Sequence, residues 1–165
     1  MPLASRGSAV GEGDIEWLYH GAMAARARLR WYGRVNRLPV IAVLDDEPKL
    51  RKALRRLLVA HGFAVVTFEH GEDVIAALTA QPMDCLLLDL HMESTNGFDV
   101  LEAIAARGLT TPVIVITGHG EPDTAARVMT MGAASYLNKP VDESSLLAAI
   151  GDAIGTRSSP WKPQP

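Results

Sequence analysis

The sequence has little that would suit an extracellular or membrane protein. It contains one cysteine, Cys85, so no disulfide can form within the chain and a reducing compartment is expected. No apolar run approaches the roughly 18 to 20 residues of a membrane span. The N-terminus also lacks the apolar segment of a signal peptide. We therefore expect a soluble cytoplasmic protein, and hydrophobic residues at 48% of the chain suffice for a core.

Excess positive charge is missing from the central part of the chain. The net charge of −3 conceals an asymmetry, because residues 1–39 carry +3, residues 40–154 carry −8 and the last residues carry +2. An acidic segment is a poor partner for nucleic acid, whose phosphates attract Lys and Arg. It does suit a metal site built from carboxylates.

Short apolar runs alternate with helix-like segments along residues 40–154. The runs predict five buried parallel strands at residues 40–44, 64–68, 85–88, 113–116 and 134–137. Helices are predicted at residues 50–61, 72–80, 98–107, 124–131 and 142–154. The first of these has leucines on one face and Arg and Lys on the other. This alternation predicts an α/β fold, a flavodoxin-like doubly wound parallel sheet of strand order 2-1-3-4-5 with helices on both faces.

The two ends of the chain differ in composition from this central domain. Residues 1–13 are rich in Gly, Ser and Ala and are expected to be disordered. Residues 14–37 can form a helix that docks or dimerises, or one that lies on a membrane surface through Arg and Trp. They can also result from a translation start placed too far upstream. The predicted organisation is an extension (1–39), one domain (40–154) and a flexible tail (155–165).

Ionisable and hydroxyl side chains follow four of the five apolar runs. Asp45 and Asp46 follow the first run, Asp89 the third and Thr117 the fourth, and Lys139 lies two residues beyond the fifth. The carboxyl ends of parallel strands share one edge of a sheet, which is where ligands bind in such folds. Three carboxylates, a hydroxyl and an ammonium at one edge suit a divalent cation and a phosphoryl group.

Each of these residues taken alone also has an ordinary explanation. Asp45 and Asp46 can be exposed turn acids, and Lys139 can be a surface lysine before a proline. Asp89 is more informative, because it ends an all-apolar run where a charge must be paired or coordinated. A carboxylate can also attack phosphorus to form an aspartyl phosphate. The occurrence of these residues in order, on four strand ends, favours one shared site.

Residues 40–154 closely resemble the receiver (CheY-like) domain of two-component response regulators. The matching motifs are Val43-Leu44-Asp45-Asp46-Glu47-Pro48, Leu88-Asp89-Leu90-His91-Met92 with Asn96-Gly97, Val115-Ile116-Thr117-Gly118, and Gly132-Ala133 with Tyr136-Leu137-Asn138-Lys139-Pro140. They include every motif of that family's site.

The resemblance implies a phosphorylation switch that depends on Mg²⁺ or Mn²⁺. The metal ligands would be Asp45, Asp46, Asp89 and the backbone carbonyl of His91. Asp89 would accept a phosphoryl group from a sensor histidine kinase or a histidine phosphotransfer protein, while Lys139 would contact the carboxylate or phosphoryl oxygens.

The resemblance also implies how the switch would act on partners. Thr117 would move to bond the phosphoryl group, and Tyr136 would follow it inward. The surface that changes would be the fourth helix, fifth strand and fifth helix, roughly residues 124–154. That surface, or the N-terminal helix, would bind a downstream protein or a second copy of the chain.

A few positions depart from the family's pattern. Glu93 stands where relatives often have proline, four residues after Asp89, and it adds negative charge near the site. Gly118 replaces a common alanine. His91 and His119 occupy positions that, in relatives, flank the phosphoryl group and tune its hydrolysis, although both can be ordinary exposed loop histidines. A zinc site is not expected, since no further His or Cys lies near them.

Only eleven residues follow position 154, so the expected protein is a stand-alone receiver that signals and is not a metabolic enzyme. Two alternatives stay open. An aspartate-nucleophile phosphatase of the haloacid dehalogenase type also pairs Asp, Thr and Lys, but it needs an acid at the position of His91. A DNA-binding regulator without its output region is the second, and the acidic domain argues against direct DNA contact.

Overall fold

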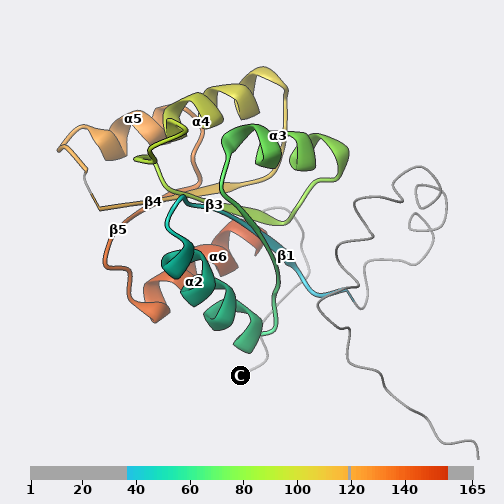
Figure 1. Ribbon diagram of the computed structural model, residues 1–165. Coiled ribbons are helices and arrows are strands. Elements are labelled where there is room, and N and C mark those ends of the chain that lie inside the picture. The colour runs from blue at the N-terminus through green and yellow to red at the C-terminus, as the bar shows by residue number, and fades with distance from the viewer. Residues whose placement is uncertain (1–36, 119, 156–165) are drawn as a thin grey trace, which may run out of the picture. The chain divides into compact units, whose positions relative to one another are not determined.

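The computed structural model describes residues 37–118 and 120–155 of the chain. Five parallel strands form one sheet in the order β2-β1-β3-β4-β5 (Figure 1). The strands are β1 (Val40–Leu44), β2 (Ala64–Phe68), β3 (Cys85–Leu88), β4 (Val113–Thr117) and β5 (Ser135–Asn138). The doubly wound α/β fold predicted from the alternation of elements is confirmed.

Helices cover both faces of the sheet, with α2 and α6 on one face and α3, α4 and α5 on the other (Figure 1). Their bounds are α2 (Pro48–Ala60), α3 (Gly71–Ala80), α4 (Gly97–Ala106), α5 (Thr124–Thr130) and α6 (Glu143–Gly155). Successive side chains of a strand point to opposite faces of the sheet. Every inner strand therefore contributes side chains to both hydrophobic cores, one on each face. Ile41 and Val43 pack toward α2 and α6, whereas Ala42 and Leu44 pack toward α3 and α4.

The helix ends follow the signals in the sequence. Gly62, Gly108 and Gly132 come after α2, α4 and α5 and have φ values of 85°, 60° and 99°, which favour glycine. Asp142 accepts a hydrogen bond from the Ser145 amide at 2.9 Å and so caps the start of α6. Asn96 caps α4 in the same way through the Phe98 amide.

The predicted boundaries were wrong by one or two residues at most elements. The helix α2 starts at Pro48, two residues before the prediction, because proline fits the first turn of a helix. Thr117 belongs to β4, and β5 covers Ser135–Asn138 where residues 134–137 were predicted. The strand β5 was also predicted to be buried, but it is an edge strand whose residues are half-buried or exposed.

Cys85 lies in β3 and has no solvent-exposed surface. Burial, with a smaller contribution from the charge of Asp84, raises the pKa of its thiol to about 12. Cys85 is therefore a small core residue in its thiol form, as the sequence predicts.

Two predictions about the rest of the chain stay predictions. The helix over residues 14–37 and the tail fall almost wholly outside the described residues, so the three-segment organisation is untested. Within the described part of the chain, no helix has the length and apolarity needed to cross a membrane.

Candidate functional site

The strand order brings the predicted site residues to one edge of the sheet. Asp45 follows β1, Asp89 follows β3, and Lys139 follows β5, with β4 between β3 and β5. Asp45, Asp46 and Asp89 each offer a carboxylate oxygen within 4.8 Å of the others. Asp45 and Asp89 are 3% and 7% exposed, so two of the three charges lie almost entirely out of water.

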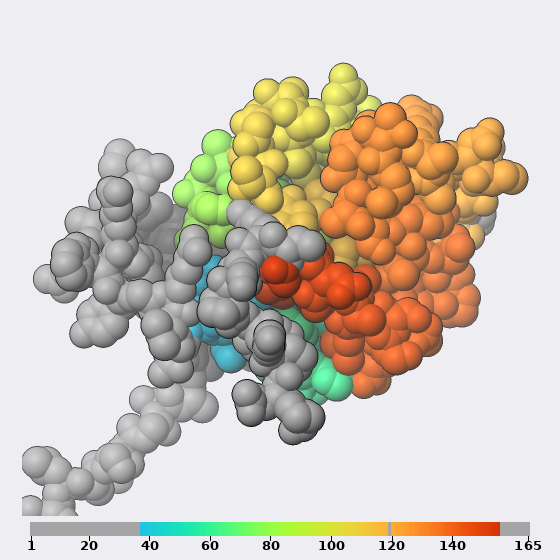
Figure 2. Space-filling view, turned by 180° about the vertical axis from the view of Figure 1, so that it is seen from behind, coloured from blue at the N-terminus to red at the C-terminus, as the bar shows by residue number. Residues whose placement is uncertain are grey.

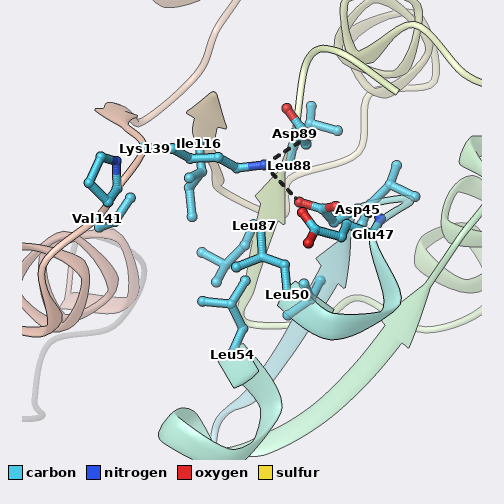
Figure 3. A pocket seen from close by; sticks show the side chains of 13 residues that line it. Asp45, Glu47, Leu50, Leu54, Leu87, Leu88, Asp89, Ile116, Lys139 and Val141 are labelled. Carbon is cyan, nitrogen blue, oxygen red and sulfur yellow. Dashed lines mark hydrogen bonds and ion pairs between the residues drawn. The ribbon is translucent and has the colours of Figure 1, made fainter. Parts of the chain in front are cut away.

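Lys139 supplies the positive charge that this burial requires. Its Nζ atom lies 3.1 Å from Asp45 Oδ2 and 3.0 Å from Asp89 Oδ2 (Figure 3). Burial alone would lower the pKa of Lys139, but hydrogen bonds to Asp89 and Asp45, together with their charges, raise it above 10.5. The ammonium therefore stays charged at neutral pH and bridges the acids of β1 and β3.

Backbone amides give each carboxylate one further partner. The three bonds are Glu47 N to Asp45 Oδ1 at 2.8 Å, His91 N to Asp89 Oδ1 at 3.2 Å, and Glu93 N to Asp46 Oδ2 at 2.8 Å. Hydrogen bonds to an ionised acceptor are among the stronger ones in proteins. They fix the orientation of the three acids despite the repulsion between their negative charges.

Glu93 contributes to the site through its main chain. Its amide donates to Asp46, while its side chain belongs to an exposed residue. A proline at this position would have no N–H and could not make this bond. Glu93 was noted in the sequence because it adds negative charge near the site. In the structure it also donates a backbone hydrogen bond to Asp46.

Thr117 and His91 form a second contact next to the acids. His91 Nδ1 lies 2.9 Å from Thr117 Oγ1. Thr117 has no exposed surface, whereas His91 is an exposed residue. His119, the other histidine singled out in the sequence, lies outside the described residues.

Tyr136 lies in the edge strand β5. It is half-buried and packs beside the core under α3, α4 and α5. Its hydroxyl lies so close to Gly120 that a Cβ atom there would overlap it. The loop after β4 thus passes directly over the tyrosine, and a larger residue at position 120 would have to displace the tyrosine hydroxyl.

Gly97 has a comparable role behind Asp89. A Cβ on Gly97 would lie 2.5 Å from the Asp89 carbonyl oxygen and 2.6 Å from Leu90 Cα. The Asn96-Gly97 motif therefore lets the start of α4 pack against the backbone just after β3. The loop between β3 and α4 is closed further by an isolated bridge between His91 and Asn96.

Arg51 is a site residue that the sequence analysis missed. Its Nη1 atom donates to the Asp45 carbonyl oxygen at 2.6 Å, and Nη2 lies 3.2 Å from Glu69 Oε2. The side chain is 15% exposed, although the basic residues of this helix were predicted to lie together on its solvent face. The only sequence feature that could have predicted this contact is the position of Arg51, one turn after the start of α2.

A cleft of about 470 Å³ opens beside Lys139, between α2 and the segment that leads into α6 (Figure 3). Its walls are mostly apolar and include Leu50, Leu54, Leu87, Ile116, Pro140 and Val141. Asp45, Asp89 and Lys139 also line it, so the cleft is continuous with the charged site.

The donor set fits a hard divalent cation. Three carboxylates converge, and such ions take oxygen ligands, usually one or two carboxylates with water or substrate oxygens. Asp46 uses Oδ2 for the Glu93 amide, and among the described residues Oδ1 has no hydrogen-bond partner. That oxygen can therefore serve as a ligand.

A family comparison identifies the class to which this fold and site belong. The model of the response regulator receiver domain matches residues 41–151, more than half of the chain. The chain therefore belongs to the response regulator receiver domain family.

Individual relatives agree with this assignment. The chain is 38% identical over 112 residues to the DNA-binding transcriptional regulator NtrC of Proteus hauseri, covering 68% of this chain and 24% of that protein. It is 35% identical over 118 residues to the transcriptional regulatory protein FixJ of Azorhizobium caulinodans, covering 72% and 56%. The chain thus spans between a quarter and about half of the length of these two relatives.

The fold also matches solved structures. The crystal structure of a response regulator receiver domain protein from Clostridium thermocellum superposes with a TM-score of 0.68 at 33% identity, covering 73% of this chain and 97% of that one.

Proposed function

We propose that Asp89 accepts a phosphoryl group from the phosphohistidine of a sensor histidine kinase or a histidine phosphotransfer protein. An Asp89 carboxylate oxygen attacks phosphorus, the N–P bond breaks, and the imidazole leaves with its electron pair. The observation that carries the proposal is the pair of contacts from Lys139 Nζ to Asp89 and Asp45, at 3.0 and 3.1 Å.

The chain's own residues have distinct roles in this proposal. Lys139 holds Asp89 in place and offsets negative charge as the phosphoryl group arrives. Asp45, Asp46, Asp89 and the His91 carbonyl would hold Mg²⁺ or Mn²⁺, which would offset negative charge on the phosphoryl group. Thr117 donates a hydrogen bond to a phosphoryl oxygen. His91 and His119 influence the rate at which the phosphoryl group is hydrolysed from Asp89.

The output in this proposal is a change of surface. Tyr136 moves when Thr117 is engaged, and it belongs to β5, which contacts both α5 and α6. Figure 2 shows residues of these three elements, coloured orange to red, side by side on one side of the molecule. A downstream protein or a second copy of the chain binds this face, in the cytoplasm.

In this proposal the chain acts as a signalling component and has no turnover beyond its own phosphorylation and dephosphorylation. The rival phosphatase needs a second acid near the nucleophile at position 91, where this chain has histidine. The DNA-binding rival gains support from the name of one relative, the DNA-binding transcriptional regulator NtrC, of which this chain covers 24%. Whether the receiver acts alone stays a prediction.

Intact-protein mass spectrometry tests the proposal. Incubation with Mg²⁺ and acetyl phosphate should give one phosphoryl adduct, absent with Asp89→Asn or EDTA. No adduct on the native protein would refute the proposal. Steady release of p-nitrophenol from p-nitrophenyl phosphate would favour the phosphatase, and DNA binding at low salt would favour the DNA-binding regulator.

A further inference from the structure

His91 contacts both the proposed phosphoryl acceptor and the proposed switch residue. Its main-chain N–H donates to Asp89 Oδ1 at 3.2 Å, and its ring Nδ1 lies 2.9 Å from Thr117 Oγ1. The histidine therefore links the strand end that carries the acceptor to the strand that carries the hydroxyl.

The Thr117 hydroxyl has a single proton to donate. When Nε2 of His91 carries the ring proton, Nδ1 is an acceptor and accepts a hydrogen bond from the Thr117 hydroxyl. A hydroxyl used in this way cannot at the same time donate to a phosphoryl oxygen on Asp89. In this tautomer, the contact with His91 and a bond from Thr117 to a phosphoryl oxygen compete for one proton.

We propose that the His91 ring is a latch that holds Thr117 in the unphosphorylated state and releases it on phosphorylation. This proposal rests on the proposed function of Asp89 and adds a regulatory role for a neighbouring side chain. His91 is a positioning residue in this account, since it acts through Thr117. The latch stabilises only the resting state. A larger fraction of the molecules must therefore be phosphorylated before the protein switches.

Two substitutions at His91 separate the ring contact from other effects. His91→Leu removes every polar atom, whereas His91→Asn keeps a polar atom the same number of bonds from Cα as Nδ1. Because His91 is exposed, neither change removes core packing. Beryllofluoride with Mg²⁺, measured by calorimetry, is the probe for the phosphorylated state. We expect His91→Leu to bind it about three- to tenfold more tightly, as one neutral hydrogen bond is lost, and His91→Asn to stay within about twofold of the native protein.

A double-mutant cycle tests the mechanism more directly. Thr117→Val keeps the shape of the side chain and removes the hydroxyl. In that background, His91→Leu should no longer change the affinity for beryllofluoride. An equal effect of His91→Leu with and without the hydroxyl would overturn the latch.

The metal-free protein offers an independent readout. Nitrogen-15 spectra of the His91 ring should show Nδ1 as an unprotonated acceptor, and this signal should shift in Thr117→Val. A ring signal identical in both proteins would overturn the latch, whatever the binding results. A native protein that does not bind beryllofluoride would overturn the proposed function as well, whereas normal binding with no effect of His91→Leu would overturn the latch alone.

Discussion

The backbone amide of Glu93 donates a hydrogen bond to Asp46 Oδ2 at 2.8 Å, joining residues that are 47 positions apart in the sequence. This bond connects the loop after β3 to an acid at the end of β1. The same loop carries the His91 amide that bonds Asp89. Metal binding at Asp46 and the conformation of this loop should therefore depend on one another.

Replacing Glu93 separates the contribution of its amide from that of its side chain. Glu93→Pro removes the N–H, and we expect the Mg²⁺ dissociation constant to rise about three- to tenfold, because a bond to a charged acceptor is worth roughly 1 kcal/mol or more. Glu93→Ala keeps the N–H and should stay within about twofold of the native value. Calorimetric titration with Mg²⁺ measures both variants, and equal affinities for Pro and Ala would contradict the role of the amide.

Loss of the Lys139 ammonium should destabilise the fold. Lys139→Met leaves the nearly buried carboxylates of Asp45 and Asp89 without their shared cation, which costs about 3 kcal/mol by analogy with broken buried pairs. Urea unfolding at pH 7 measures the change, and added Mg²⁺ should restore part of it by binding the folded state. Lys52→Met, at an exposed position of α2, is the matched control and should stay within about 0.5 kcal/mol.

The pH dependence of the same variant follows from the direction of the Lys139 pKa shift. Because the pKa is raised in the folded protein, its contribution to stability is complete below about 10.5 and is lost as pH rises through the folded value. The native protein should therefore lose stability above about pH 10.5 more steeply than Lys139→Met. Parallel alkaline unfolding curves would contradict this assignment.

Arg51 should matter for stability because it ties α2 to the backbone beside the site. Arg51→Met removes the bond to the Asp45 carbonyl oxygen and the ion pair with Glu69, and a loss of about 1 to 2 kcal/mol is expected. Arg56→Met, an exposed residue of the same helix, is the control. A shift in the urea midpoint that is the same for both variants would show that Arg51 acts only as a surface charge.

Asp142 gives a prediction in acid. Hydrogen bonds from Ser144 and Ser145 lower the pKa of Asp142 from 3.8 to about 2. The stability it contributes is complete above about pH 4 and is lost as pH falls toward 2. Asp142→Ala should therefore lower the melting temperature clearly at pH 7 and by much less at pH 2, where about half of the folded molecules already have Asp142 protonated. Asp152→Ala, an exposed acid of the same helix, is the control and should show no such convergence.

The bounds of the inner strands β1 and β3 could be predicted because helices cover both of their faces. Buried side chains on both faces make β1 and β3 continuous apolar runs, and both predicted boundaries match the structure. The edge strand β5 is only half-buried, so its apolar run and its hydrogen-bonded ladder do not coincide. The prediction there was therefore shifted by one residue.

The side chains at the strand ends could be found from sequence, but several of their partners could not. Asp45, Asp89 and Lys139 could be predicted because each is a charged residue that lies just after an apolar run. The Glu93 amide and the Asp45 carbonyl are backbone groups. Every residue has a backbone carbonyl and every residue except proline has a backbone N–H, so residue type does not predict these contacts. The ring contact between His91 and Thr117 depends on the path of the loop after β3, which periodicity does not describe.

The burial of Cys85 makes this chain convenient for site-directed labelling. Thiol reagents react with the thiolate, and a pKa of about 12 in a side chain without exposed surface leaves almost none at neutral pH. The native protein should thus remain unmodified by maleimides while folded. A cysteine introduced on α5 or α6 can then carry a fluorophore or spin label in an otherwise natural sequence, and report on that face directly.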